Sequence, residues 1–447
     1  MQNLPFRLIN RLRESYWFWP SVLTVAAIAL GILLPLTDRL LGPQWAAGIT
    51  FVHTSEPEGA RAILTTLASA ILGVGGVAFS ITIVAVSFAS SNYGPRLIGN
   101  FMADRINQFV LGTFVATFVY CVVVLTTVHD SSDVAEIGQF VPQLSIYVAL
   151  VLGIISIAAL IAYIHHIPES INIMNLTETI GTRLCGAVIA MLDEEAMRDR
   201  ADANAEAIDI APWREGGVGD TRAILPAPRP GFLQQFDLAH LGNIARECGV
   251  QITLERSPGE FVASHDALIS VRPAGKLDDA LRQALGAGYT LGAQRTDVQD
   301  VLFLSDQLVE VLVRALSPGV NDPNTAMLCL GWLRAGLSDF ARRPPSPPTS
   351  PYAPLRYSRV TFEAMLDRSF DRMRRHIAGD RTVTLAALAG LADIAAVAVR
   401  AAMAEACVRQ MKQLATSAME LQAESIAKTE IDDALAAALQ RVAQPRD

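Results

Sequence analysis

Four long apolar runs without a charged residue dominate the first part of this chain. They cover residues 17–36, 63–89, 109–128 and 143–164. A helix needs roughly 20 apolar residues to cross a hydrocarbon core of about 30 Å, and every run is long enough. The runs are apolar continuously rather than in alternation, which favours helices over the strands of a barrel. The sequence therefore predicts an α-helical membrane protein with four transmembrane helices, and the lipid bilayer as its surroundings.

Composition supports a membrane part followed by a water-soluble part. Hydrophobic residues make up 51% and charged residues 18% of the 447 residues, against roughly 45–50% and about 25% in typical soluble proteins. The charges gather after residue 170. A net charge of −8 without a long basic stripe leads us to expect no nucleic-acid partner. The five cysteines are scattered without metal-binding spacing, so we expect neither a metal nor another cofactor.

Basic residues around the apolar runs set the expected orientation. Positively charged flanks stay on the cytoplasmic side of a membrane. The loop between the third and fourth runs carries three acidic residues and no Lys or Arg, so we expect it outside. Both termini, and everything after residue 170, are then expected in the cytoplasm. The basic residues that carry this prediction are Arg7, Arg11, Arg13, Arg96 and Arg105.

The second run places small and hydroxyl residues on one helical face, because they recur at three-, four- and seven-residue intervals. Two interpretations stay open. The face can let another helix approach closely, with hydroxyl groups bonding across the contact, or it can line a narrow polar path through an oligomer. No Asp, Glu, Lys, Arg or His lies inside the four runs, which disfavours a proton-coupled transporter but not a passive pore. The residues of this face are Thr65, Ser69, Gly73, Gly76, Ser80 and Ser87.

The chain after the four-helix transmembrane domain (1–170) predicts a cytoplasmic α+β domain in several parts. Residues 171–230 are expected to form a connecting helix and a Gly/Pro-rich linker, and residues 231–276 a small β-α-β-β module. Residues 277–342 are expected to be a helical domain. A Pro-rich linker (343–354) and a helical C-terminal region (355–447) complete the chain. Within that region, residues 383–442 are Ala-rich and are expected to be helical with only a weak interruption at Gly390.

Residues 315–326 form the most unusual segment of the soluble part. Asp322 before Pro323 predicts an N-cap followed by proline at the first position of a helix. A capped helix–turn–helix and a site for a cation or a polar ligand both fit the polar residues there. Those residues are Ser317, Asn321, Asp322, Asn324 and Thr325.

A second candidate group lies just upstream, at the start of an amphipathic helix expected over 297–316. Arg295 is expected to pair with Asp297 or Asp300, because carboxylates are favoured near the amino end of a helix. This group is predicted to belong to the same ligand or structural motif.

Several segments together resemble one family of bacterial inner-membrane proteins of unknown function, DUF2254. The resemblance covers roughly residues 7–337 and implies an integral, multi-pass protein of the bacterial inner membrane; it assigns no activity. Where the family tends to have a glycine after Phe261-Val262, this chain has Ser264-His265-Asp266. The matching segments are residues 79–84, 89–96, 111–114, 258–262, 295–300 and 315–326.

Two functional hypotheses follow. The first is an oligomeric channel or pore, lined by the second helix and gated by the cytoplasmic domain; the Ala-rich tail offers an assembly surface, so a homo-oligomer is expected. The alternative is a membrane-anchored ligand-sensing or scaffold protein without transport activity, whose ligand is unknown. We expect no enzymatic activity, because no nucleophile elbow, phosphate-binding glycine loop or metal-ligand cluster appears.

Overall fold

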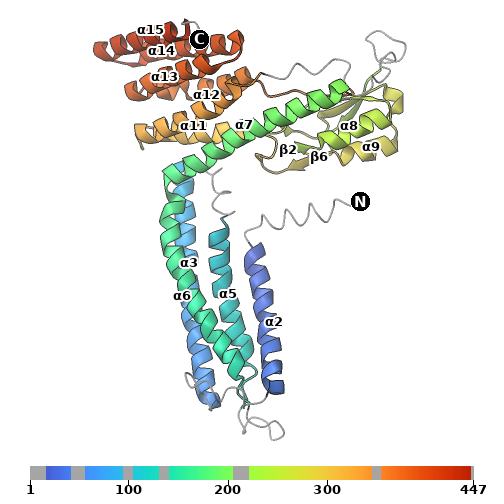
Figure 1. The fold of residues 1–447 in the computed structure, drawn as a ribbon, viewed down its shortest axis with the longest axis vertical. Coiled ribbons are helices and arrows are strands. Elements are labelled where there is room, and N and C mark those ends of the chain that lie inside the picture. Colours follow the sequence, from blue (N-terminus) through green and yellow to red (C-terminus); the bar gives the residue numbers. More distant parts are fainter. Residues whose placement is uncertain are drawn as a thin grey trace. The chain divides into compact units, whose positions relative to one another are not determined.

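A computed structural model describes residues 17–41, 56–93, 104–129, 140–204, 221–344 and 354–443. The chain divides into two compact units, residues 1–175 and 176–447. Figure 1 shows the long helices of the first unit and the mixed sheets and helices of the second.

The first unit contains four long apolar helices, and each has the length and composition needed to cross a membrane. The four predicted membrane helices are therefore confirmed as helices of membrane-spanning length. Within its most apolar stretch, the third of them is 56% buried, against 22% for each of the first two and 28% for the fourth, so this helix is the central one. The helices are α2 (Phe18–Leu41), α3 (Pro57–Tyr93), α5 (Arg105–Leu125) and α6 (Gln143–Ile171).

Small and hydroxyl residues join the helices of this unit. A Cβ at Gly112 of α5 would lie 2.8 Å from Leu23 Cδ1, so glycine lets α2 pass close by. Between α3 and α6, the Thr82 and Tyr163 hydroxyl groups are 2.7 Å apart. Close approach and buried hydroxyl pairs are the usual means of helix association where lipid removes the hydrophobic driving force.

A buried carboxylate from α2 caps the start of α6. Asp38 is only 6% exposed. Its two oxygens accept hydrogen bonds from Leu144 N at 2.9 Å, from Ser145 N at 3.1 Å and from Ser145 Oγ at 2.9 Å. The first N–H groups of a helix have no partner within the helix, and negative charge is favoured there. Asp38 thus satisfies, from another helix, donors that α6 cannot satisfy itself.

We expect Asp38→Ala to lower the free energy of unfolding of the membrane unit by about 1–3 kcal/mol, because buried N–H groups lose their acceptor. Titration of the purified protein in mixed micelles with SDS would measure this. Asp38→Asn keeps one acceptor oxygen and should lose less. If Asp38→Ala proved as stable as the wild type, the cap would have no energetic role.

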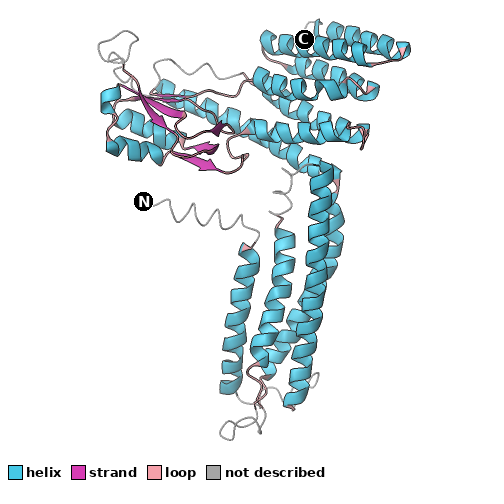
Figure 2. Cartoon of the chain, turned by 180° about the vertical axis from the view of Figure 1, so that it is seen from behind, coloured by secondary structure: helices cyan, strands magenta, loops and turns pink. Residues whose placement is uncertain are grey.

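The second unit begins with α7 (Ile173–Asn204), most of whose length belongs to it. Two small sheets follow, and Figure 2 sets these strands apart from the helices. One sheet has the order β1-β5-β3-β7, antiparallel except for the parallel pair β3–β7. The other has the order β4-β2-β6 and is antiparallel. The strands are β1 (Ala223–Pro226), β2 (Gly231–Phe236), β3 (Gln251–Leu254), β4 (Phe261–Val262), β5 (Ala267–Arg272), β6 (Tyr289–Gly292) and β7 (Leu355–Arg356).

The sheets extend beyond the module predicted over 231–276. Inside that range β2, α8 (Leu238–Glu247), β3 and β5 occur in the expected order. However, β1 lies in the predicted linker and β6 in the predicted helical domain. Strands of two to four residues are too short to show a period-two pattern, so hydrophobic periodicity does not reveal them.

In the turn between β4 and β5, a residue other than glycine adopts the left-handed backbone conformation. His265 has φ +74°, a conformation that usually favours glycine. Its N–H donates to Ala227 O at 3.1 Å, and Ala227 N donates to Asp266 O at 2.8 Å. The loop after β1 therefore holds the turn in place.

Besides α8, seven α-helices in the described part of the chain follow the sheets or lie between their strands. The Ala-rich stretch predicted to be interrupted only weakly at Gly390 is in fact divided into three helices, α13, α14 and α15, and Gly390 lies inside α13. The breaks fall at residues 398–400 and 422–424, and the three helices pack against one another through their buried faces. The helices are α9 (Asp279–Gly286), α10 (Val301–Ala315), α11 (Pro323–Ala341), α12 (Phe362–Ile377), α13 (Arg381–Val397), α14 (Ala401–Leu421) and α15 (Ser425–Ala443).

Candidate functional site

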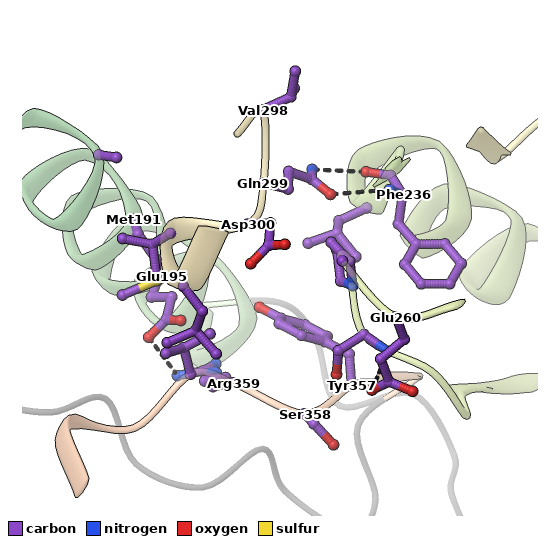
Figure 3. Close-up of a pocket in the computed structure, with 18 of the residues that line it drawn as sticks. Met191, Glu195, Phe236, Glu260, Val298, Gln299, Asp300, Tyr357, Ser358 and Arg359 are labelled. Atoms are coloured by element: carbon purple, nitrogen blue, oxygen red, sulfur yellow. Dashed lines mark hydrogen bonds and ion pairs between the residues drawn. The ribbon is translucent and has the colours of Figure 1, made fainter. Parts of the chain in front are cut away.

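The second unit contains a cavity of about 430 Å³, shown in Figure 3. Five segments meet there: α7, the end of β2 with the start of α8, the turn between β3 and β4, residues 295–302, and residues 357–360 with the first turns of α12. Sites for small molecules usually measure about 300–1,000 Å³. Much of the wall is apolar, with Met191, Phe236, Leu254, Leu302 and Val360 among its residues.

Trp332 fixes α7, which forms one wall, against α11. A Cβ at Gly181 of α7 would collide with the Trp332 ring, so the ring rests directly on the helix backbone. Leu184 packs one turn further along, close to Gly336. Arg183 of α7 also forms an ion pair with Asp297. These contacts position the following turns of α7 at the cavity.

The Pro258-Gly259-Glu260 turn meets the segment 295–300 at the cavity. Gly259 has φ +90°, and its N–H donates to Leu233 O at 2.7 Å. A Cβ at Gly259 would collide with the carboxylate of Asp300. Both the backbone conformation and the close approach therefore require glycine.

Gln299 joins this segment to the end of β2. Its side-chain amide donates to Phe236 O at 2.8 Å and accepts from Phe236 N at 2.9 Å, as Figure 3 shows. A side chain thus replaces the backbone partner that a neighbouring strand would supply.

Arg295 pairs with Asp300 rather than with Asp297. Its Nε and Nη2 donate to Asp300 Oδ2 at 2.9 and 2.7 Å. The other oxygen of Asp300 accepts from Phe303 N at 3.1 Å and caps α10. Burial raises the pKa of Asp300, while the Arg295 guanidinium opposes this shift.

Asp306 binds three guanidinium groups. The sequence patterns alone did not mark it as a candidate site residue. It is 1% exposed. Arg295 Nη1 donates to it at 2.7 Å, Arg368 donates through Nη2 at 2.8 Å and Nε at 3.1 Å, and Arg372 donates through Nη1. Burial would raise the pKa of Asp306, but the hydrogen bonds from Arg368 and Arg295 outweigh it and hold the pKa below its usual range.

The sequence held only a weak signal for this cluster. Arg368 and Arg372 are four residues apart on a highly charged helix, a pattern typical of a solvated face. Asp306 lies on the buried face of α10, where a carboxylate needs charged partners. The sequence signal for such a cluster is an acidic residue on the apolar face of one helix together with two basic residues four positions apart on another helix.

A further ion pair lies on the cavity wall. Glu195 of α7 and Arg359 are 4.0 Å apart, and their side chains are 11% and 12% exposed. Figure 3 shows the pair beside Tyr357, whose ring lies 5.7 Å from the Arg359 guanidinium carbon. The cavity therefore carries charged groups of both signs within an apolar wall.

Asp322 caps α11, as its position before Pro323 predicts. Its Oδ1 accepts from Asn324 N at 3.1 Å and Thr325 N at 3.2 Å, and its Oδ2 accepts from Thr325 Oγ1 at 2.6 Å. The Thr325 hydroxyl in particular lowers the pKa of Asp322. Asn321 (φ +48°) and Ser317, which donates to Arg314 O at 2.6 Å, complete the turn. None of these residues lines the cavity, so the two candidate groups lie apart.

The small and hydroxyl face of α3 points away from the rest of its unit. All six residues, Thr65, Ser69, Gly73, Gly76, Ser80 and Ser87, are exposed, whereas α5 and α6 pack on the opposite face. Within the described residues, a Cβ at Gly73 or Gly76 would meet nothing within 4 Å. None of the other described helices of this unit therefore covers this face.

We expect Gly259→Ala to lower the free energy of unfolding by about 2 kcal/mol or more, because strain at a positive φ adds to the collision with Asp300. Thermal unfolding of the purified full-length protein would measure the loss. Gly275→Ala is the matched control, because Gly275 has no positive φ and its Cβ would meet nothing within 4 Å. Equal losses in the two variants would refute the steric argument.

Comparison with known proteins places these features in one family. The profile of DUF2254, described as a predicted membrane protein, matches residues 13–393. Uncharacterized proteins of Mycobacterium bovis and Mycobacterium tuberculosis are each 29% identical to the chain over 348 residues, which are 77% of this chain. The match spans 64% of each relative's length, less than two thirds. No solved structure matches the chain.

Proposed function

Because the chain belongs to the DUF2254 family of predicted membrane proteins, which has no assigned activity, we propose a function from its own geometry. We propose that it is a membrane-anchored sensor. A small ligand binds in the cavity of the second unit, and binding acts on the membrane helices through α7. The single observation that carries this proposal is the cavity, whose wall includes α7.

The chain connection supports a link between the cavity and the membrane helices. Only Asn172 separates the end of α6 from the start of α7. Residues 187–198 of α7 contribute to the cavity wall. A ligand with different affinities for two positions of α7 shifts the population between them. Such a shift would act on the last membrane helix through a connection of one residue.

The proposal includes a location. The basic flanks of the apolar runs favour placing both termini and the cavity in the cytoplasm, with the helices in the bacterial inner membrane. The ligand would then be a cytoplasmic molecule.

We expect small aromatic fragments to bind the wild-type cavity and Ala187→Trp to abolish this binding, because indole at residue 187 fills space beside Met191. The probes are 4-fluorobenzoate, 4-fluorophenyl phosphate, 4-fluorobenzamide and 4-fluorobenzylamine, observed by fluorine NMR with the full chain in nanodiscs. At least one should show line broadening that competes with an excess of its non-fluorinated parent.

Ala196→Trp is the matched control, since residue 196 lies on the same helix but does not line the cavity. It should retain fragment binding. If no fragment bound, or if Ala187→Trp and Ala196→Trp bound equally well, the cavity would not be a ligand site.

A second candidate function is an oligomeric pore gated by the second unit. The observation that favours it is the exposed small and hydroxyl face of α3, which lies opposite the buried face of this helix. Small residues allow the helices of two chains to approach closely. Hydroxyl groups and backbone carbonyls are also groups that line ion pathways.

If this face lines a pore or joins copies of the chain, Ser80→Leu should abolish ion flux in proteoliposomes or lower the mass of the detergent-solubilised complex. Ala70→Leu is the control, because Ala70 is exposed on α3 outside this face. A monomeric wild type without flux would refute both forms of the hypothesis.

A further inference from the structure

The guanidinium group of Arg368 is held along one edge by Asp306, and its other edge is open. Its Nε and Nη2 donate to the buried carboxylate of Asp306. Its Nη1 makes no hydrogen bond to the described residues, its side chain is 42% exposed, and it lines the cavity. A planar guanidinium has five N–H donors and binds carboxylate or phosphate through two of them at once.

The other arginines of the cluster do not offer the same edge to the cavity. All three guanidinium nitrogens of Arg295 donate to Asp300 or Asp306, so this residue is structural. Arg372 also binds Asp306 and is 44% exposed, but it does not line the cavity. Arg368 is therefore the member of the cluster that can meet a ligand.

The lining of the whole cavity contains five arginines and five acidic residues, but the charge of the cluster around Asp306 favours an anion. Three guanidinium groups, from Arg295, Arg368 and Arg372, share the carboxylates of Asp300 and Asp306, which leaves one positive charge in excess. Because Asp306 already fixes Arg368, a ligand would not have to immobilise this side chain, and this lowers the entropic cost of binding.

A further cationic group lies on the cavity wall in the turn between β3 and β4. Arg256 stands 3.6 Å from Glu260 and 3.5 Å from Asp266, too far for strong hydrogen bonds. Its side chain is 38% exposed and lines the cavity. It can move toward an anion without losing a tight partner.

Resting on the proposed function, we infer that the cavity binds a small organic anion, a carboxylate or a phosphate ester, through Arg368. The apolar wall formed by residues such as Phe236, Leu254 and Leu302 would hold the ligand's hydrocarbon body. Asp306 is a positioning residue that orients Arg368, and Arg256 adds a second positive charge.

The test compares Arg368→Gln with Arg372→Gln in the fragment assay described above. Wild type should bind 4-fluorobenzoate or 4-fluorophenyl phosphate at least tenfold more tightly than the amide and the amine. Arg368→Gln should weaken anion binding tenfold or more, and Arg368→Lys, which keeps the charge but not the fork of donors, should fall between. Arg372→Gln should stay within twofold of the wild type, although it too removes a partner of Asp306.

The outcomes separate this inference from the proposed function. An amide or amine that binds as well as the anions, or equal losses in Arg368→Gln and Arg372→Gln, overturns the anion site. The ligand cavity survives that result if binding stays sensitive to Ala187→Trp. If no fragment binds the wild type, both proposals fall. The ratio between benzoate and phenyl phosphate affinities shows whether carboxylate or phosphate is preferred, and thermal unfolding of each variant shows that it is folded.

Discussion

The second unit depends on one buried carboxylate, Asp306. A buried charge costs several kcal/mol unless it is paired and hydrogen-bonded, and Asp306 meets this condition only when segment 295–300, α10 and α12 come together. The same contacts fix the wall on which Arg368 lies. Wrong placement of any of the three segments would leave a charge without its partner. Hydrophobic packing alone would permit several arrangements of these elements. The need to pair the buried charges therefore selects one of them.

The membrane unit meets a related requirement with far fewer polar groups. Its helices carry no Asp, Glu, Lys, Arg or His inside their apolar runs, so buried polar atoms gather at a few defined places. Asp38 satisfies the first donors of α6, and the Thr82–Tyr163 hydroxyl pair joins α3 to α6. In both units a carboxylate lies at a helix start. Asp38 connects α2 to the start of α6, whereas Asp300 acts locally, because it caps its own helix, α10, and binds Arg295 five residues earlier. Contacts such as that of Asp38 specify which helices become neighbours, because apolar surfaces alone do not discriminate between partners.

Local features were predictable from the sequence, and features that depend on distant residues were not. The four membrane helices were predictable because their apolar runs are longer than a helix in the core of a soluble protein requires. The cap of α11 was predictable because Asp322 directly precedes Pro323. By contrast, Asp306 and its arginine partners on α12 are separated by 62 and 66 residues. The two-residue strand β7 pairs with β3 across about a hundred residues, so no local pattern reveals it. Likewise, periodicity grouped Ser80 with the other small residues of its face, but only packing showed that this face points outward.

In the proposed function, the position of α7 is the physical means by which the cavity would signal. One wall belongs to this helix, and the others belong to the end of β2 with the start of α8, the turn after β3, segment 295–302 and the start of α12 with the residues before it. Any displacement of α7 relative to those elements changes the volume of the cavity and the surroundings of Glu195, which pairs with Arg359 across it. Ligand affinity and the position of α7 are then linked, and linkage acts equally in both directions. If the proposed ligand binds, a change in the membrane helices that moved α7 would alter its affinity by the same factor by which the ligand shifts the equilibrium between the positions of α7.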